Sequence, residues 1–174
     1  MRIEVIRANE RHRGLLRRLY ELYVHDFSPM TRADIGDDGW WTADDFLIPW
    51  PDDELQIFLV RVNERWAGFA WVARGSYVDP LTDDHYLMDE FFILRKFRRQ
   101  GLGEQLAVRL FNRFEGVWEV GEIPANVEAQ AFWRMVIGRY TDHRFREVTV
   151  NNERWQGPVQ VFSTAPLRLG DRLP

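Results

Sequence analysis

The strongest chemical signal in the sequence is residues 89–103, which read Asp-Glu-Phe-Phe-Ile-Leu-Arg-Lys-Phe-Arg-Arg-Gln-Gly-Leu-Gly. Two adjacent carboxylates, Asp89 and Glu90, open this run, and either could take a proton from a substrate. Arg98 and Arg99 lie close to its end, where a helical apolar pattern begins. Exposed N–H groups at a helix N-terminus, the helix dipole and nearby arginines together favour an anion, and phosphate in particular.

Two glycines, Gly101 and Gly103, allow the chain to turn tightly and to approach a ligand closely at this point. Other phosphate-binding loops fit less well. A dinucleotide-binding fingerprint would need a further glycine at position 106, which is Leu106, and it should follow the first strand. A Walker A loop would need Gly-Lys-Ser/Thr, which the sequence lacks. A plain tight turn remains the alternative to an anion site.

The elements that must position this run follow from hydrophobic periodicity. Alternation or β-rich composition predicts strands, with a hairpin at Asn63-Glu64 and another turn at Asn151-Asn152. The expected strands are 2–7, 55–62, 65–73, 86–94, 117–120, 145–150 and 159–163. Helical spacing predicts helices over 10–26, 43–47, 101–114 and 126–136. This order predicts an α/β fold with a mixed sheet, in which parallel crossovers are confined to the middle, rather than a doubly wound nucleotide fold.

Arg98-Arg99-Gln100-Gly101-Leu102-Gly103 resembles the Q/R-x-x-G-x-G/A pyrophosphate loop of the GNAT N-acetyltransferase superfamily. Downstream, Asn126, Ala129 and the pair Phe132-Trp133 are similar to the N-x-x-A-x-x-aromatic helix of that family. The resemblance extends over nearly the whole chain, because the expected order of elements also agrees. It implies a single domain over residues 1–174, with a central, mostly antiparallel, splayed sheet flanked by helices.

The resemblance also implies a site for acetyl-CoA as cosubstrate. The pantetheine arm would lie beside the fourth strand, bonded to backbone groups of Phe91 and Ile93. The loop over Arg98, Arg99, Gln100, Gly101, Leu102 and Gly103 would hold the pyrophosphate. Asn126 would contact the pantetheine, and Ala129 and Phe132 would pack beside it.

The implied reaction is direct attack of an amine on the acetyl thioester, which the absence of cysteine fits. A carboxylate must then accept the amine proton, and Glu90 is the first candidate, followed by Asp89, with Glu119 and Glu122 as rivals. The family often uses a tyrosine to protonate the leaving thiolate. Here Trp133 stands in that place, so Tyr140 or solvent would have to supply the proton.

An acidic and aromatic segment follows the first expected helix. Residues 26–54 hold nine acids and one base, a local charge of −8 that leaves +4 for the remainder of a chain of net charge −4. Asp26, Trp40 and Trp41, together with Asp34, Asp37 and Asp38, could attract a cationic amine by charge and cation–π contact. The alternative is a solvated acidic loop with tryptophans tucked into the core.

The composition excludes several other kinds of site and classes of protein. The 174 residues contain no cysteine, which excludes disulfides, thiolate metal sites and a cysteine nucleophile. The four histidines lack metal-ligand spacing, so we expect no metal site. The negative net charge argues against a nucleic-acid partner, and no apolar run approaches the ~20 residues that span a bilayer. We therefore expect a cytoplasmic protein acting on a small-molecule or peptide amine, with a homodimer left open by the family resemblance.

Two other functions remain open at this point. Trp133 makes a catalytically silent acyl-CoA-binding or sensing module on the same fold a reasonable alternative to an N-acetyltransferase. A purely structural α/β interaction protein is a third reading. Release of free thiol from acetyl-CoA with an amine panel separates the first two, and thermal stabilisation by coenzyme A separates both from the third.

Overall fold

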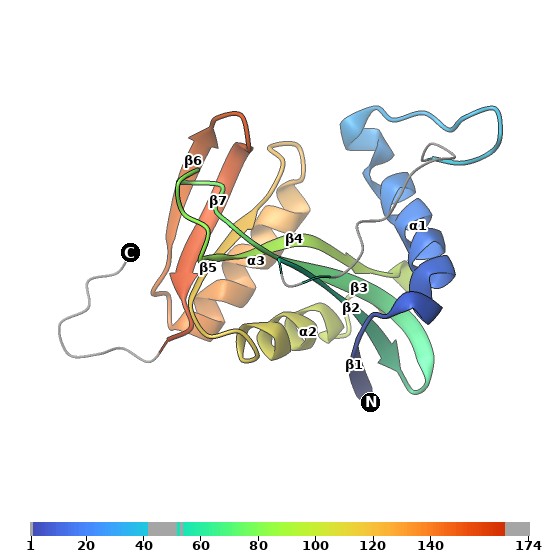
Figure 1. The fold of residues 1–174 in the computed structure, drawn as a ribbon, viewed down its shortest axis with the longest axis horizontal. Helices are drawn as coiled ribbons and strands as arrows, with labels where there is room; N and C mark the ends of the chain where they lie inside the picture. Colours follow the sequence, from blue (N-terminus) through green and yellow to red (C-terminus); the bar gives the residue numbers. More distant parts are fainter. Residues whose placement is uncertain (1, 42–51, 53, 166–174) are drawn as a thin grey trace.

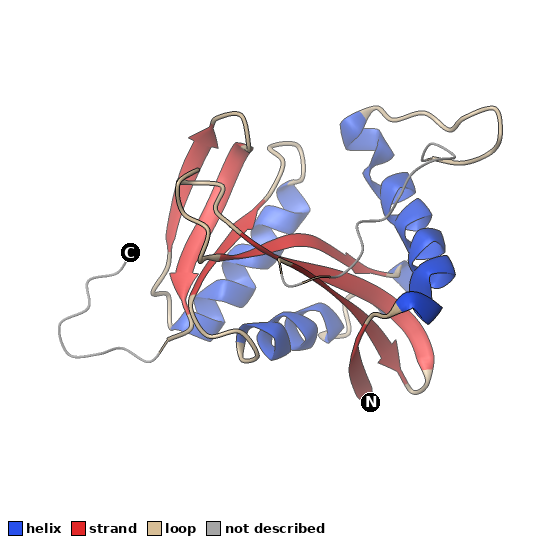
Figure 2. Cartoon of the chain, viewed as in Figure 1, coloured by secondary structure: helices blue, strands red, loops and turns tan. Residues whose placement is uncertain are grey.

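The computed structural model describes residues 2–41, 52 and 54–165 of the chain. The strands are β1 (Ile3–Arg7), β2 (Leu55–Val62), β3 (Arg65–Arg74), β4 (Tyr86–Ile93), β5 (Val117–Gly121), β6 (Arg146–Asn151) and β7 (Gln156–Ser163). The α-helices are α1 (Arg13–Thr31), α2 (Leu102–Phe111) and α3 (Val127–Thr141), and short 3-10 turns cover Glu10–His12 and Arg95–Phe97. Figure 2 shows how the helices flank the strands. The expected helix at 43–47 lies outside the described residues.

The strands form one seven-stranded sheet of order β1-β2-β3-β4-β5-β7-β6. Every neighbouring pair is antiparallel except β4 and β5, which are parallel. The α/β class and the mostly antiparallel mixed sheet predicted from the sequence are therefore confirmed. Parallel pairing requires a crossover, and α2 supplies it between β4 and β5 (Figure 1).

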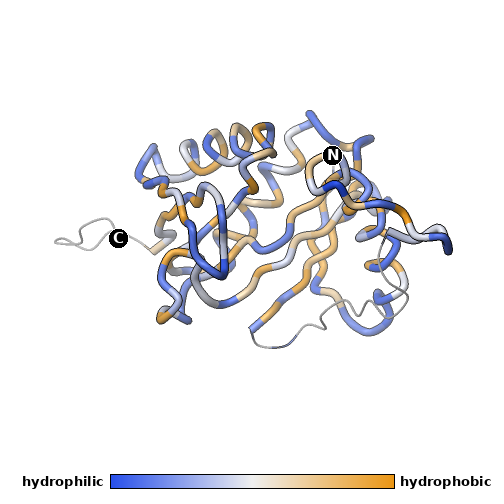
Figure 3. The backbone as a smooth tube through the Cα atoms, turned by 90° about the horizontal axis from the view of Figure 1, so that it is seen from above, coloured by the Kyte–Doolittle hydropathy of each residue, from blue (hydrophilic) through white to orange (hydrophobic). Residues whose placement is uncertain are grey.

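The helices cover opposite faces of the sheet because the strand residues alternate. Ile57, Leu59, Phe69 and Trp71 join Leu16 and Leu19 of α1 in one apolar cluster. The intervening residues of the same strands pack with α2 and α3 in a second and larger cluster. Figure 3 shows the hydrophobic residues gathered along the central strands, with hydrophilic residues at the turns. This arrangement brings side chains of α1, β4 and α3 close to one another.

Three helix ends differ from the sequence prediction. α1 runs to Thr31 rather than to Asp26, although it contains Pro29. The ring of Pro29 removes a backbone donor, and the hydroxyl of Ser28 donates to the carbonyl of His25 at 2.8 Å in its place. α3 continues five residues past the expected end at Val136, whereas α2 ends at Phe111, before the expected Phe114. Periodicity locates elements better than it locates their ends.

The sheet opens between β4 and β5. Their pairing is limited to Tyr86 with Trp118 and Leu87 with Glu119, after which the two strands diverge. The register between β3 and β4 also shifts, since Trp71 pairs with Glu90 and Val72 with Met88. Asp89 is thus the extra residue of a β-bulge, a feature that often lies next to active sites.

Candidate active site

A cavity of about 1040 Å³ occupies the space where β4 and β5 diverge. Its walls come from α1, β4, the loop into α2, the end of β5 and the first half of α3. Residues predicted from the sequence that line it are Asp26, Asp89, Glu90, Phe91, Ile93, Arg98, Arg99, Gly101, Gly103, Asn126, Ala129 and Phe132. Residues drawn from five separate elements therefore share one cavity.

The loop before α2 has the properties of an anion site. Gly101 is the N-cap residue of α2 with φ +74°, and no side chain caps the helix, so its first N–H groups remain open to a ligand. Gly103 leaves room where a Cβ would lie 3.1 Å from Cζ of Phe132. Gln100 and Leu102 lie off the cavity: the Gln100 amide donates to the Lys96 carbonyl at 2.9 Å, and Leu102 is buried in the core. These two side chains therefore contact the rest of the protein and not the cavity.

The edge of β4 that faces the opening carries main-chain polar groups. The N–H of Leu94 donates to the carbonyl of Ala67 at 2.8 Å, on the β3 side. Since successive residues of a strand point their polar groups to opposite sides, Phe91 and Ile93 direct theirs toward β5. The carbonyl of Ile93 is already bonded to Nε of Arg98 at 2.6 Å. Phe91 and the N–H of Ile93 can therefore meet a ligand that enters between the strands.

Glu90 occupies a position suited to proton transfer. Burial, together with the neighbouring charge of Asp89, raises the pKa of Glu90 to about 7, while the hydroxyls of Tyr23 and Tyr20 act in the opposite direction. A base with a pKa close to the working pH combines a large ionised fraction with useful basicity. Tyr20 and Tyr23 lie on α1 and line the cavity. Burial also raises the pKa of each tyrosine, so both hydroxyls remain protonated donors.

Tyr20 and Tyr23 fall within the helix expected over residues 10–26, but the sequence prediction gave neither of them a role in the site and so missed their contact with Glu90. Two tyrosines three residues apart among leucines are the only local signal of it. Trp133 lines the cavity wall against Phe91, with ring centroids 4.9 Å apart. Tyr140 does not line the cavity, and its hydroxyl bonds Asn112 Oδ1 at 2.8 Å. The tyrosine suggested as a proton donor to the thiolate is thus directed elsewhere.

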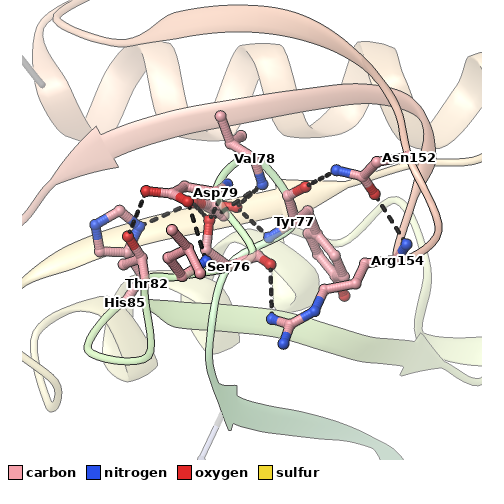
Figure 4. A network of polar contacts seen from close by, with 10 residues as sticks. Ser76, Tyr77, Val78, Asp79, Thr82, His85, Asn152 and Arg154 are labelled. Carbon is pink, nitrogen blue, oxygen red and sulfur yellow. Dashed lines mark hydrogen bonds and ion pairs between the residues drawn. The ribbon is translucent and has the colours of Figure 1, made fainter.

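Asp89 is held by a residue from the loop after β3. The hydroxyl of Tyr77 donates to Asp89 Oδ1 at 3.1 Å. Partial desolvation in the cavity raises the pKa of Asp89, while this hydrogen bond acts in the opposite direction. The carbonyl of Tyr77 accepts from the side-chain amide of Asn152 at 2.8 Å, in the turn between β6 and β7 (Figure 4). The second carboxylate of the site is therefore fixed by contacts that reach across the sheet.

Glu119 anchors that loop rather than lining the cavity. Its fully buried carboxylate accepts from the Ser76 hydroxyl at 2.5 Å and from the Tyr77 N–H at 2.7 Å, and it contacts His85 Nδ1 at 2.8 Å. Figure 4 shows Ser76, Tyr77 and His85 gathered in this network. Glu119 is absent from the cavity lining, so its position favours a structural role over that of a base.

We expect Glu119→Ala to lower the free energy of unfolding by about 3 kcal/mol or more, because several buried donors lose their acceptor. Thermal unfolding measured beside Glu115→Ala provides the comparison, since Glu115 is exposed in the loop before β5. Surface changes of that kind usually stay within about 0.5 kcal/mol. Equal melting temperatures for the two variants would contradict a structural role for Glu119.

Glu122 is the remaining rival carboxylate. It is buried at the end of β5 and lines the cavity. Burial raises its pKa to about 8, and the charge of Glu147 adds to the effect. Both carboxyls thus have a pKa raised toward neutral pH. Glu90 differs from Glu122 in its place, because it lies on β4 beside Phe91, whose main-chain groups face the opening.

Asn126, which was predicted to contact the pantetheine, lies at the N-terminus of α3. The side-chain oxygen of Asn126 caps α3 by accepting from the N–H of Ala129 at 3.1 Å.

Trp40 and Trp41 do not line the cavity. The guanidinium of Arg17 lies 4.9 Å from the Trp40 ring, and the N–H of Trp41 donates to Glu21 Oε2 at 2.7 Å. Among the acidic and aromatic residues predicted to bind the acceptor, the structure brings only Asp26 to the cavity.

The described residues contain no group of three or more His, Cys, Asp or Glu side chains arranged to hold a metal ion. No helix among them combines the length and the apolar character needed to cross a bilayer.

Comparison with known proteins agrees with this architecture. The family model of the acetyltransferase (GNAT) family matches residues 16–138, well over half of the chain. A search of curated proteins gave no match.

Solved structures share the fold at low sequence identity. The ribosomal-protein-S18-alanine N-acetyltransferase of Escherichia coli is 12% identical with a TM-score of 0.59, over 98% of this chain and 99% of that one. An aminoglycoside acetyltransferase from an uncultured soil sample, solved with sisomicin, is 14% identical with a TM-score of 0.60, over 88% and 95%. An aminoglycoside N-acetyltransferase solved with CoA is 18% identical with a TM-score of 0.51, over 76% and 89%. On the evidence of the family match, this chain belongs to the GNAT acetyltransferase family.

Proposed function

We propose that this protein transfers an acetyl group from acetyl-CoA to an amine by direct attack within a ternary complex. The observation that carries the proposal is the shared cavity, which joins the uncapped N-terminus of α2, the open edge of β4 and Glu90. A pyrophosphate at the α2 loop would place an extended arm along Phe91 and Ile93. The thioester would then lie near the bulge that carries Asp89 and Glu90.

The proton balance follows from the side chains of the cavity. A cationic amine loses two protons in this reaction. Glu90 accepts the first, which frees the nitrogen lone pair, and releases it to solvent. As the amine nitrogen bonds the acetyl carbon and the carbon–sulfur bond breaks, Glu90 accepts the second proton. A thiol has a reference pKa of about 8.5. The proton on Glu90, whose pKa is about 7, is therefore acidic enough to pass to the departing thiolate, directly or through water. No tyrosine acid is needed in this scheme, which accommodates Trp133.

We propose that the acceptor is a cationic amine. Asp89 and Glu90 supply negative charge to the cavity, and Tyr20, Tyr23 and Trp155 add aromatic walls. The GNAT structures described above include one named for a ribosomal-protein alanine and one solved with an aminoglycoside, so the shared fold is compatible with acceptors of different size. The acidic loop that holds Trp40 and Trp41 is less suited to this role than the β4 bulge.

Thiol release from acetyl-CoA in the presence of polyamines, aminoglycosides, amino acids and N-terminal peptides tests the proposal. We expect thiol release with at least one cationic class and none without acceptor. Binding of CoA with no turnover on any amine would indicate the silent acyl-CoA-binding module instead. Turnover restricted to neutral or anionic acceptors would contradict the cationic site. Failure of CoA to raise the melting temperature would exclude both acetyl transfer and acyl-CoA binding.

A further inference from the structure

Asp26 joins α1 to the segment that follows β4. Its carboxylate accepts from Nε of Arg95 at 2.9 Å, and its second oxygen pairs with Nη2 of Arg98. Arg95 and Arg98 lie 69 and 72 residues further along the chain. The Asp26 side chain is only 12% exposed, whereas the side chains of Arg95 and Arg98 are 74% and 40% exposed. Hydrogen bonds between a carboxylate and guanidinium groups are stronger than those between neutral groups.

The same face of α1 touches Glu90. Tyr23 and Tyr20 precede Asp26 by three and six residues, and this spacing places the three side chains along one side of a helix. Both tyrosines interact with Glu90 on β4, and Tyr23 also packs against Phe92 with ring centroids 5.8 Å apart. The helix thus contacts β4 at Glu90 and, one turn later, contacts the residues that follow β4.

Arg98 connects this contact to the anion loop. Its Nε donates to the Ile93 carbonyl at 2.6 Å and its Nη2 is bound by Asp26, so the guanidinium is held in place at the start of the loop. Among the described residues no acceptor bonds its Nη1, whose two donors can serve a ligand. Arg98 and Arg99 both line the cavity. One carboxylate therefore links the second half of α1 to the arginine at the start of the loop.

We propose that Asp26 is a positioning residue, which holds Arg95 and Arg98 and thereby fixes α1 so that Tyr20 and Tyr23 keep Glu90 in its working orientation. This inference rests on the proposed acetyl transfer. It gives Asp26 a role other than the acceptor binding expected from the sequence, since both carboxylate oxygens are already engaged by arginine.

The proposal predicts opposite effects on binding and on turnover. Asp26 places a negative charge next to the anion loop, so its removal should strengthen the attraction for the CoA phosphates. Arg98 keeps its position in the variant, because its Nε still donates to the Ile93 carbonyl. Removal should also loosen α1 from β4 and weaken the hydroxyl contacts that keep Glu90 ionised. The groups that face Glu90 are Asp89 on its own strand, Tyr20 and Tyr23 on α1, and Tyr77 from the loop after β3. Only the two α1 contacts depend on Asp26.

The experiment compares Asp26→Asn, Asp26→Glu and Arg95→Gln in the full chain, with Glu10→Gln as the control. Glu10 forms an exposed ion pair with Arg13 near the start of α1, far along the helix from Asp26. CoA affinity is measured by calorimetry, turnover with the best amine by thiol release, and the Glu90 titration by carboxyl ¹³C NMR.

For Asp26→Asn we expect CoA to bind about 3- to 10-fold more tightly. We expect kcat to fall roughly 10-fold and the pKa of Glu90 to rise above about 7. Asp26→Glu should restore kcat and the pKa toward the wild-type values. Arg95→Gln should raise the pKa of Glu90 without any gain in CoA affinity, because it removes a cation. Glu10→Gln should match the wild-type protein in all three measurements.

Each contrary result has a distinct meaning. A higher KM for the amine, with kcat and CoA affinity unchanged, would assign Asp26 to acceptor binding and overturn the proposal. An unchanged Glu90 titration in both Asp26→Asn and Arg95→Gln would overturn it as well. If Asp26→Asn does not fold, Arg95→Gln and Asp26→Glu still decide the outcome. Absence of turnover in the wild-type chain would contradict the proposed function, whereas the NMR titration would still test the coupling between Asp26 and Glu90.

Discussion

Replacement of Glu90 by Gln is expected to lower kcat by about 10²- to 10⁴-fold, the range typical of loss of a general base. Gln has nearly the same shape but does not accept a proton at neutral pH. The acetyl-CoA KM should change little, because Glu90 belongs to β4 and not to the loop expected to bind the phosphates. Steady-state kinetics with saturating amine measures both quantities.

The pH profile is the sharper measurement. Glu90 acts as a base only when ionised, so wild-type kcat should rise with pH through an apparent pKa near 7 and then level off. Glu90→Gln should lack this limb. Glu122→Gln is the matched comparison, since that carboxyl lines the same cavity with a pKa of about 8. If the limb survives in Glu90→Gln and disappears in Glu122→Gln, the base is Glu122.

The same substitution should stabilise the fold above neutral pH. The pKa of Glu90 is higher in the folded protein, at about 7, than its ordinary value of 4.5. The folded state therefore favours the protonated form, and stability falls as the pH rises from about 4.5 through 7. Gln carries no charge to bury and avoids this cost. A higher melting temperature for Glu90→Gln at pH 8, with lower activity, would separate a catalytic carboxylate from a structural one.

Local pattern was enough to predict the sheet and the glycine turn before α2. The β-rich runs from Leu55 to Ala73 and from Tyr86 to Leu94 are largely apolar because both faces of the sheet are covered by helices, and these apolar runs are visible in the sequence. The glycines at 101 and 103 lie within a few residues of the arginines, so the loop is a local feature as well.

Contacts between distant segments could not be predicted in this way. Asp26 looked like part of an acidic segment, yet it pairs with Arg95 and Arg98, which no local spacing relates to it. Tyr20 and Tyr23 share the period of a core-facing helix, and periodicity does not distinguish a side chain that enters a core from one that lines a cavity. The β4 bulge at Asp89 depends on register with β3, which is a property of the pair.

Replacement of Gly101 by Glu is expected to reduce acetyl-CoA affinity by at least about 100-fold, or roughly 2.8 kcal/mol. Two effects add. Gly101 has φ +74°, a conformation that costs other residues about 1–2 kcal/mol. A carboxylate at the N-cap of α2 would also face the phosphates, and two like charges 4 Å apart repel by about 4 kcal/mol at an effective dielectric constant of about 20. Calorimetric titration with CoA measures the loss.

Two control variants separate these effects. Gly101→Ala introduces only the backbone strain, so it should lose some stability and about 10-fold or less in affinity. Gly14→Glu adds the same charge on α1, where a new Cβ meets no heavy atom within 4 Å, and it should bind CoA like the wild-type protein. If Gly101→Glu bound CoA as tightly as Gly14→Glu, the phosphates would not lie at the N-terminus of α2. The loop would then be a structural turn, and the cavity would have to bind CoA in another orientation.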